Sequence, residues 1–238
     1  VATALIELGL VESSGPVCSV TIDTPSGLIT ANATIAGAKV TSVEIEMPKS
    51  FLEHSDLEIY VDGMGNVKVD VAFGGCYFVL VDIAQLQIEI CNQNAEKLVS
   101  LGKAIKKAAS EQITVQHPEF NELNSIEYTM FVEKSLPQIK TSTILYPGRV
   151  DRSPCGTGTS AQLAALIAKG EVNSDQEITS ESIIGGQFFA NTKKHLKCGS
   201  RDAIVPIMRG RAWIYGKTEF LIDQSDPFLS GYTLSDTW

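Results

Sequence analysis

The chain has 238 residues, and 44% of them are hydrophobic, which is enough for one large domain or two smaller halves. Its formal net charge is −9, with 28 acidic and 19 basic residues, and no basic run is longer than a pair. This charge pattern disfavours nucleic acid and anionic membranes as partners. A small-molecule partner is therefore expected.

Cysteine and histidine usage limits the chemistry further. The five cysteines are an odd number without a Cys-x-x-Cys pair, so reduced thiols and a cytoplasmic location are expected. The three histidines, His54, His117 and His195, lack the spacing of a metal site, and His117 and His195 are interpreted as surface or turn residues. We therefore predict no metal, and no apolar run approaches the length of a membrane span.

In chain order, residues 1–9 predict a helix that ends at Gly9. Alternating segments then predict strands at 17–22, 28–35, 39–47, 57–61 and 67–73, the last two joined as a hairpin by Asp62-Gly63 and Gly65-Asn66. A helical pattern follows at 95–110, with lysines mostly away from its apolar face. Further strands are expected at 126–132, 141–145, 203–208 and 211–222. This order favours an α+β fold over regular alternation of strands and helices.

The segment Asp151-Arg-Ser-Pro-Cys-Gly-Thr-Gly-Thr159 places a cysteine before an apolar helical run at 161–168. Glycines and threonines form a turn rich in hydrogen-bond donors, so Cys155 is expected beside a helix N-terminus. Unpaired backbone N–H groups there favour anions, and they can lower the pKa of a thiol or hold a carboxylate. The segment therefore predicts a reactive cysteine, while a buried structural thiol is the alternative.

A short internal repeat links this helix to the start of the chain. Ala4-Leu-Ile-Glu-Leu-Gly9 matches Ala165-Leu-Ile-Ala-Lys-Gly170 at four of six positions, with a constant offset of 161. The same offset carries Cys155 back to position −6, upstream of Val1. If the duplication includes the turn, a second reactive residue is expected there.

The segment ending at Ser160 resembles the second cysteine motif of the proline racemase family. That family also includes 4-hydroxyproline 2-epimerases and trans-3-hydroxyproline dehydratases. Other agreeing segments are Phe73-Gly-Gly75, Leu101-Gly-Lys-Ala-Ile105, His117-Pro118, Glu181-Ser-Ile-Ile-Gly185, Gly210-Arg-Ala-Trp213 and Asp226-Pro227 to Gly231-Tyr232. The family's first motif, Met-Cys-Gly-His, would directly precede Val1, so the chain is expected to lack that motif and, as given, to be inactive.

The resemblance implies a fold like that of diaminopimelate epimerase. Such a fold has two pseudo-symmetric halves, each a mixed, mainly antiparallel β-sheet wrapped around a central helix. Residues 1–48 would be the remainder of the first half, to which C-terminal strands at about 210–238 are candidates to return. Residues 49–209 would form the second half with the Cys155 motif. A homodimer is compatible with this family.

The resemblance also implies a cofactor-independent inversion at Cα of proline or hydroxyproline. Two cysteines on opposite sides of the substrate would act as acid and base. Cys155 would be one of them, the backbone N–H groups of Gly156 and Thr157 would hold the substrate carboxylate, and Asp151 would pair with the ring ammonium. Cys76 and Tyr77 are candidate pocket-lining residues, with a core position as the alternative for Cys76.

Three alternatives remain open. Dehydration of trans-3-hydroxy-L-proline is disfavoured because dehydratases of the family usually carry threonine where this chain has Cys155. A non-catalytic homologue that binds an imino acid is the second alternative. Between proline and 4-hydroxyproline, the absence of a histidine in Ser125-Ile-Glu-Tyr128 slightly favours proline.

Overall fold

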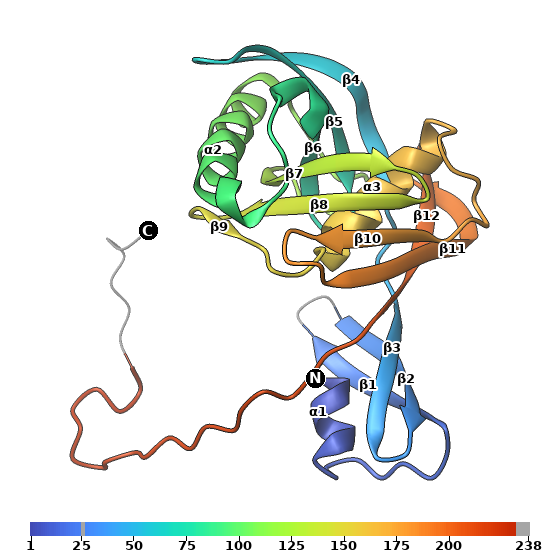
Figure 1. The fold of residues 1–238 in the computed structure, drawn as a ribbon, viewed down its shortest axis with the longest axis vertical. Coiled ribbons are helices and arrows are strands. Elements are labelled where there is room, and N and C mark those ends of the chain that lie inside the picture. Colours follow the sequence, from blue (N-terminus) through green and yellow to red (C-terminus); the bar gives the residue numbers. More distant parts are fainter. Residues whose placement is uncertain (25–26, 232–238) are drawn as a thin grey trace.

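The computed structural model describes residues 1–24 and 27–231, and its named strands belong to one sheet (Figure 1). The strands are β1 (Val17–Thr24), β2 (Gly27–Ala36), β3 (Lys39–Glu46), β4 (Phe51–Val61), β5 (Gly65–Phe73), β6 (Tyr77–Asp82), β7 (Ile126–Ser135), β8 (Gln138–Leu145), β9 (Arg149–Val150), β10 (Ile178–Ser182), β11 (Gln187–Cys198) and β12 (Arg201–Gly210). The helices are α1 (Ala2–Glu7), α2 (Ala95–Gln112) and α3 (Gly156–Ala168), with short 3-10 helices η1 (Ile83–Leu86) and η2 (Asn92–Asn94). The strand order is β1-β2-β3-β12-β11-β10-β8-β7-β6-β5-β4, and β9 pairs with β8.

The strands from β4 to β12 curl around α3, which crosses behind β7, β8 and β10 in Figure 1. The curl brings the start of β4 to β12, where the backbone groups of Ser50 and Ile204 exchange hydrogen bonds of 2.8 and 2.9 Å. The helix is apolar on nearly every side, and its residues 158–166 are all buried. A helix without a polar face is stable only inside a core. The predicted central helix and its mixed, mainly antiparallel sheet are therefore confirmed, with parallel pairing at β6–β7 and β8–β10.

Helix α2 covers the outer face of the same sheet. Its apolar face is buried through Leu98, Ile105 and Ala109, whereas Lys97 and Lys107 are exposed, as its sequence pattern predicts. Gly102 sits where a Cβ atom would lie 2.5 Å from Ile144 of β8, so glycine permits the close approach of helix and sheet. The Thr129 hydroxyl donates a 2.8 Å hydrogen bond to the Gly102 carbonyl across this contact.

We call the strands from β4 to β12, which curl around α3, the barrel. Helix α1 and strands β1–β3 form a smaller unit below this barrel in Figure 1. Its core contains Ile6, Cys18, Val20, Ala33 and Val40. Strand β3 continues the sheet by pairing with β12, so the unit is hydrogen-bonded to the barrel. The expected division at residues 48 and 49 falls in the connection between β3 and β4.

The repeat found in the sequence has the same hydrogen bonds in both copies. After α1, the N–H groups of Leu8, Gly9 and Leu10 donate to the carbonyls of Ala4, Ile6 and Leu5. After α3, the N–H groups of Lys169, Gly170 and Glu171 donate to the carbonyls of Ala165, Ile167 and Leu166. Every donor and acceptor is related by 161 residues, and both glycines have φ of +69°, so both helices end in the same way.

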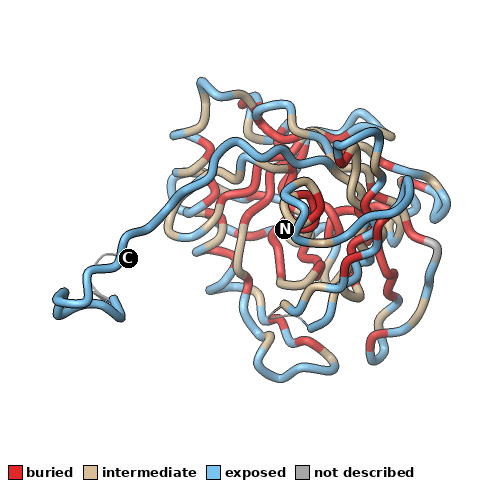
Figure 2. The backbone as a smooth tube through the Cα atoms, turned by 90° about the horizontal axis from the view of Figure 1, so that it is seen from below, coloured by how far each residue is buried: buried red, intermediate tan, exposed pale blue. Residues whose placement is uncertain are grey.

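Two features differ from the sequence expectations. Strands β6, β10 and β11 were not predicted, because β6 is a continuous apolar run and β11 carries several charges, so neither shows clean alternation. The strand expected at 211–222 is absent: residues 211–231 form neither helix nor strand, and Figure 2 shows them as an exposed segment leaving the body. An extended segment becomes a strand only when a partner strand pairs with it, and none of the described residues does so. The rest of the expected C-terminal strands, residues 232–238, lies outside the described residues.

Candidate active site

Cys155 lies between β9 and α3 and is the N-cap residue of α3. Its backbone φ is 65° and its ψ is 105°. This conformation is costly for a residue with a Cβ atom and must be stabilised by its surroundings. The Cys155 N–H donates to the Ser153 hydroxyl at 3.1 Å, and the Ser153 N–H donates to Asp151 Oδ1 at 2.8 Å. The Cys155 carbonyl accepts from the Thr159 N–H at 2.8 Å. The turn therefore holds the thiol at the start of the central helix, where the sequence motif predicts it.

The Cys155 thiol is 7% exposed, and its Sγ atom lies 3.7 Å from the Thr157 hydroxyl. Burial raises the pKa of the Cys155 thiol, and hydrogen bonds from the Gly158 backbone and the Thr157 side chain only partly oppose this. The helix N-terminus therefore lowers the pKa through the Gly158 N–H, as expected, but desolvation is the larger effect and the net shift is upward.

Asp151 takes part in the hydrogen bonds of the turn itself. Its Oδ1 atom accepts the Ser153 N–H, and its own N–H donates to the Thr143 carbonyl at 2.9 Å. Oδ2 has no hydrogen bond within the described part of the chain, so the carboxylate keeps one oxygen for a further partner. The structure thus brings Asp151, Cys155, Gly156 and Thr157 together within one turn, as predicted.

The glycine pair after β5 holds the start of α3 in place. A Cβ atom at Gly74 would lie 2.1 Å from the Thr157 carbonyl oxygen and 2.6 Å from the Ala161 nitrogen. A Cβ atom at Gly75 would lie 2.9 Å from Thr157 Cγ2, at a φ of +122°. The close neighbour of this glycine pair is therefore α3.

Cys76 and Tyr77 point to different sides of the sheet. Cys76 packs in the cluster that includes Cys155, and burial followed by the Cys155 charge raises the pKa of Cys76 to about 12. Tyr77 is fully buried on the α2 side, where its ring meets Phe51 and Phe73. Of the two candidate lining residues, only Cys76 lies beside Cys155.

A cavity of about 390 Å³ opens beside the start of α3. It is lined on one side by the beginning of α1 and on the other by the turn that precedes α3, including Ser153 and Gly156. The remaining lining residues are mainly apolar: Val43, Ile45, Met47, Phe188, Met208, Gly210, Arg211 and Ala212. The starts of the two repeated helices therefore face one cavity, an arrangement that the sequence repeat could indicate but not locate.

Met47 and Phe188 were not identified from the sequence. Met47 follows β3, and its Cε atom would lie 3.6 Å from a Cβ atom at Gly156; Phe188 lies on β11. Neither residue belongs to a motif, and both are far from Cys155 in the sequence. Only the pairing of β3 with β12, and of β12 with β11, brings them to the cavity.

His117 is buried at 3% exposure rather than lying at the surface, although it does form part of a turn. Its Nδ1 atom accepts the N–H groups of Glu119 and Phe120 at 3.1 and 3.2 Å, and Nε2 lies 3.8 Å from Cys198 Sγ. Its ring packs against Phe51 and Phe73. Burial lowers the pKa of His117, which fits an imidazole that caps a turn in its neutral form.

Within the described residues, no group of three or more histidine, cysteine, aspartate or glutamate side chains is placed to hold a metal ion. No helix there is long and apolar enough to span a membrane. All five cysteines are free thiols. The expectations of no metal and no cofactor stay predictions.

Comparisons with known proteins identify one family over most of the chain. The sequence model of a family described as "Proline racemase" matches residues 1–233. The "4-hydroxyproline 2-epimerase" of Rhizobium etli is 37% identical over 239 residues, covering 100% of this chain and 69% of the relative. The protein of the same name from Agrobacterium fabrum is 36% identical over 237 residues, covering 99% of this chain and 69% of the relative.

Two solved structures of similar sequence share the fold of this chain. A hydroxyproline epimerase from Agrobacterium vitis, solved with bound trans-4-hydroxy-L-proline, superposes with a TM-score of 0.88 at 36% identity, covering 100% of this chain and 69% of that one. A probable proline racemase from Agrobacterium radiobacter with bound carbonate gives a TM-score of 0.87 at 36% identity, covering 100% and 70% of the two chains.

Proposed function

Because the chain belongs to the proline racemase family, we propose that the protein is an isomerase that inverts the Cα configuration of an imino acid. The first substrate to test is trans-4-hydroxy-L-proline, since that is the ligand of the solved relative and the curated relatives carry the name of the corresponding epimerase. L-Proline is the second substrate to test, because the sequence slightly favours it and one similar solved structure is described as a probable proline racemase. No cofactor forms part of the proposal.

The observation that carries the proposal is the position of Cys155. Cys155 has strained backbone dihedrals and lies at the N-terminus of the central helix. Its neighbours Ser153 and Gly156 line a cavity that the beginning of α1 also lines. Strain of this kind is concentrated at functional sites. A Cys155 thiol whose pKa is raised by burial can act as the acid that gives a proton to one face of Cα.

Substrate binding would use the groups around this thiol. The free N–H groups at the start of α3, including those of Gly156 and Thr157, would hold the substrate carboxylate. The open oxygen of Asp151 would accept a hydrogen bond from the ring ammonium. A base on the opposite face would remove the Cα proton, and the matching ends of α1 and α3 support a position before Val1 for it.

The test uses the protein expressed from its own gene, with any residues that precede Val1. Chiral chromatography would follow conversion of trans-4-hydroxy-L-proline to cis-4-hydroxy-D-proline and of L-proline to D-proline. Cys155→Ser should lose a factor of about 10² to 10⁴ in kcat, because it removes a positioned acid. Cys91→Ser is the matched control, since Cys91 lies in the turn before η2 and outside the α3 cluster. Full activity of Cys155→Ser would contradict the proposed role.

Two further assays separate the alternatives. Formation of pyrroline-2-carboxylate from trans-3-hydroxy-L-proline would identify a dehydratase instead. Tight binding of pyrrole-2-carboxylate without exchange of the Cα hydrogen in heavy water would identify a non-catalytic binding protein. A cytoplasmic location is also part of the proposal, supported by the five free thiols.

A further inference from the structure

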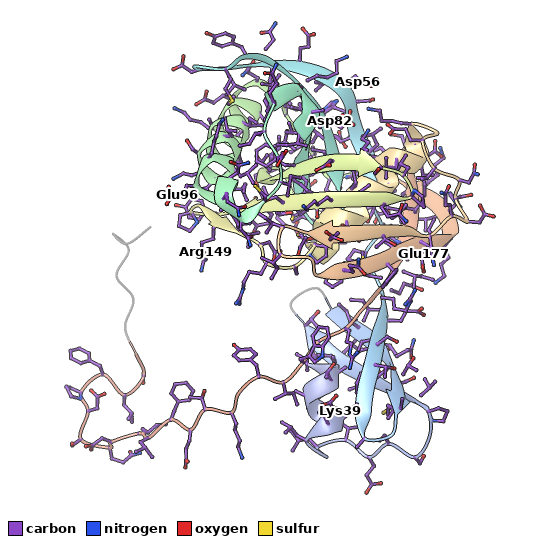
Figure 3. All side chains as sticks on the ribbon, in the orientation of Figure 1. Lys39, Asp56, Asp82, Glu96, Arg149 and Glu177 are labelled. Atoms are coloured by element: carbon purple, nitrogen blue, oxygen red, sulfur yellow. The ribbon has the colours of Figure 1, made fainter. Side chains whose placement is uncertain are left out.

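Thr143 of β8 lies beside the turn that carries Cys155. The chain folds back on β8 through β9, whose exposed Arg149 is labelled at the outside of the barrel in Figure 3, and then enters this turn. The Asp151 N–H donates a 2.9 Å hydrogen bond to the Thr143 carbonyl. The backbone of β8 is therefore attached directly to the cysteine motif.

The side chain of Thr143 lies on the same face of the sheet as Cys155. Thr143 pairs with Met130 of β7, and directly opposite residues of antiparallel strands share a face. Met130 belongs to the same buried cluster as Cys155. A Cβ atom at Gly158 would lie 3.1 Å from Met130 Sδ and 3.2 Å from Cys155 Sγ. The Thr143 hydroxyl is therefore on the side of β8 where the thiol lies.

This hydroxyl is buried without a hydrogen-bond partner. Thr143 is 1% exposed, and its Oγ1 atom has no partner of normal hydrogen-bond geometry. A buried hydroxyl without a partner is destabilising, and such groups are uncommon in folded proteins. The neutral Cys155 thiol is only a weak acceptor, whereas its thiolate would be a strong one. Deprotonation of Cys155 would therefore give the Thr143 hydroxyl an acceptor.

The titratable groups that face Cys155 do not stabilise a thiolate. They are Asp151 in the same turn, Cys76 between β5 and β6, and Tyr128 of β7. None of these side chains becomes a cation. Burial, and after it the charge of Asp151, raises the pKa of Cys155. The thiolate therefore needs hydrogen bonds from neutral donors.

Three neutral donors surround Cys155 Sγ. Burial raises the pKa of this thiol, and three groups oppose that effect: the Gly158 N–H, the Thr157 hydroxyl and the Thr143 hydroxyl. The Thr157 hydroxyl lies 3.7 Å from Sγ. Gly158 and Thr157 belong to α3, which begins next to Cys155, whereas Thr143 comes from β8. The third donor is therefore brought to the thiol by tertiary structure.

We propose that Thr143 is a positioning residue for the Cys155 thiolate: its hydroxyl donates a hydrogen bond to Sγ once the thiol has given up its proton. When Cys155 takes the proton back, the hydroxyl is left without a partner, as in this structure. Thr143 acts through Cys155 and does not touch the substrate. This role rests on the proposed function for its place in proton transfer, but the hydrogen bond itself can be measured without substrate.

The first test measures the thiolate of Cys155 in the protein expressed from its own gene. Iodoacetamide alkylates thiolates, and mass spectrometry of the peptide that contains Cys155 separates this thiol from the other cysteines. Thr143→Val has nearly the same shape but no hydroxyl. At pH 7, below the raised pKa of Cys155, alkylation of Thr143→Val should be about 10- to 100-fold slower, because a hydrogen bond to a charged group is lost.

Ser142→Ala is the matched control. Ser142 also has a buried hydroxyl without a partner, but it pairs with Phe131 and lies on the α2 side of the sheet. Ser142→Ala and Thr143→Ser should be alkylated at the parental rate, and Thr143→Val should melt at the same or a higher temperature. Parental alkylation of Thr143→Val would overturn the proposal, as would an equal loss in Ser142→Ala or in Thr143→Ser.

Activity gives a second readout. In the direction in which Cys155 acts as the base, kcat/KM should rise with pH, and Thr143→Val should displace this rise by about 1–2 pH units upward. Thr143→Ser should restore the parental profile. Slower alkylation of Thr143→Val in a protein that converts no imino acid would refute the proposed function and still support the hydrogen bond. Conversion with the same pH profile in Thr143→Val and the parent would refute the role of Thr143.

Discussion

Gly74→Ala tests whether the glycine pair after β5, Gly74 and Gly75, positions the turn that carries Cys155. The new Cβ atom would lie 2.1 Å from the Thr157 carbonyl oxygen, whereas ordinary contacts begin near 3.4 Å, so the start of α3 must move by about 1.3 Å. Overpacking of a core typically costs about 1–3 kcal/mol, and a displacement of about 1 Å at a reacting group costs about 10²-fold in rate. The variant should therefore lose about 10²-fold in kcat while it still folds.

The measurements are thermal denaturation and the epimerisation assay on the protein from its full gene. The melting temperature should fall by about 2–4 °C for each kcal/mol lost, so a shift of about 2–12 °C is expected. Gly15→Ala is the matched control, because no atom lies within 4 Å of a Cβ atom at Gly15 and its φ is not positive. Parental activity and stability in Gly74→Ala would show that α3 is not held by this contact.

Two further predictions concern stability. Burial lowers the pKa of His117 in the folded state. The contribution of His117 to the free energy of unfolding is therefore complete above its unfolded pKa of about 6.5, and it falls as the pH drops below that value. The free energy of unfolding of the parent should decline between about pH 6.5 and 5, and it should decline more weakly in His117→Gln. His195→Gln is the control, because His195 is exposed, and it should behave as the parent does. Equal slopes in all three proteins would exclude His117 as the titrating group. Asp70→Asn should lower the free energy of unfolding by about 1–3 kcal/mol, because it breaks the partly buried ion pair with Lys169. Asp202→Asn should lower it little, because that ion pair is exposed. Comparison of the urea midpoints of the two variants tests this difference.

The ion pair of Lys169 with Asp70 also predicts that stability depends on pH, with a sign opposite to that expected for His117. Hydrogen bonds with Asp70 raise the pKa of Lys169 above its usual value, although burial opposes them. The stabilisation is then complete below the unfolded pKa of about 10.4 and is lost as the pH rises through the higher folded value. Alkaline unfolding of Asp70→Asn should show a smaller component of this kind, because Lys169 keeps its contact with Asp56.

The local elements follow from the sequence because their causes are local. The hairpin of β4 and β5 is specified by Gly63 and Gly65, which both adopt positive φ, and α2 is specified by one apolar face. The Cys155 motif and the matching helix ends likewise depend on neighbouring residues, so their glycines and helix formers could be recognised directly. The sequence by itself therefore determined the fold class, the family resemblance and the place of the reactive thiol.

Only the tertiary structure decided what surrounds that thiol. Its raised pKa results from burial by residues of several strands, which outweighs the local helix effect that the sequence suggested. Met47 and Phe188 reach the cavity only through strand pairing between distant segments, and Tyr77 turns away because successive strand residues alternate between faces. Residues 211–222 have a strand-like sequence but lack a partner strand among the described residues. Burial and pairing depend on the whole chain, and for this reason sequence patterns alone did not determine them.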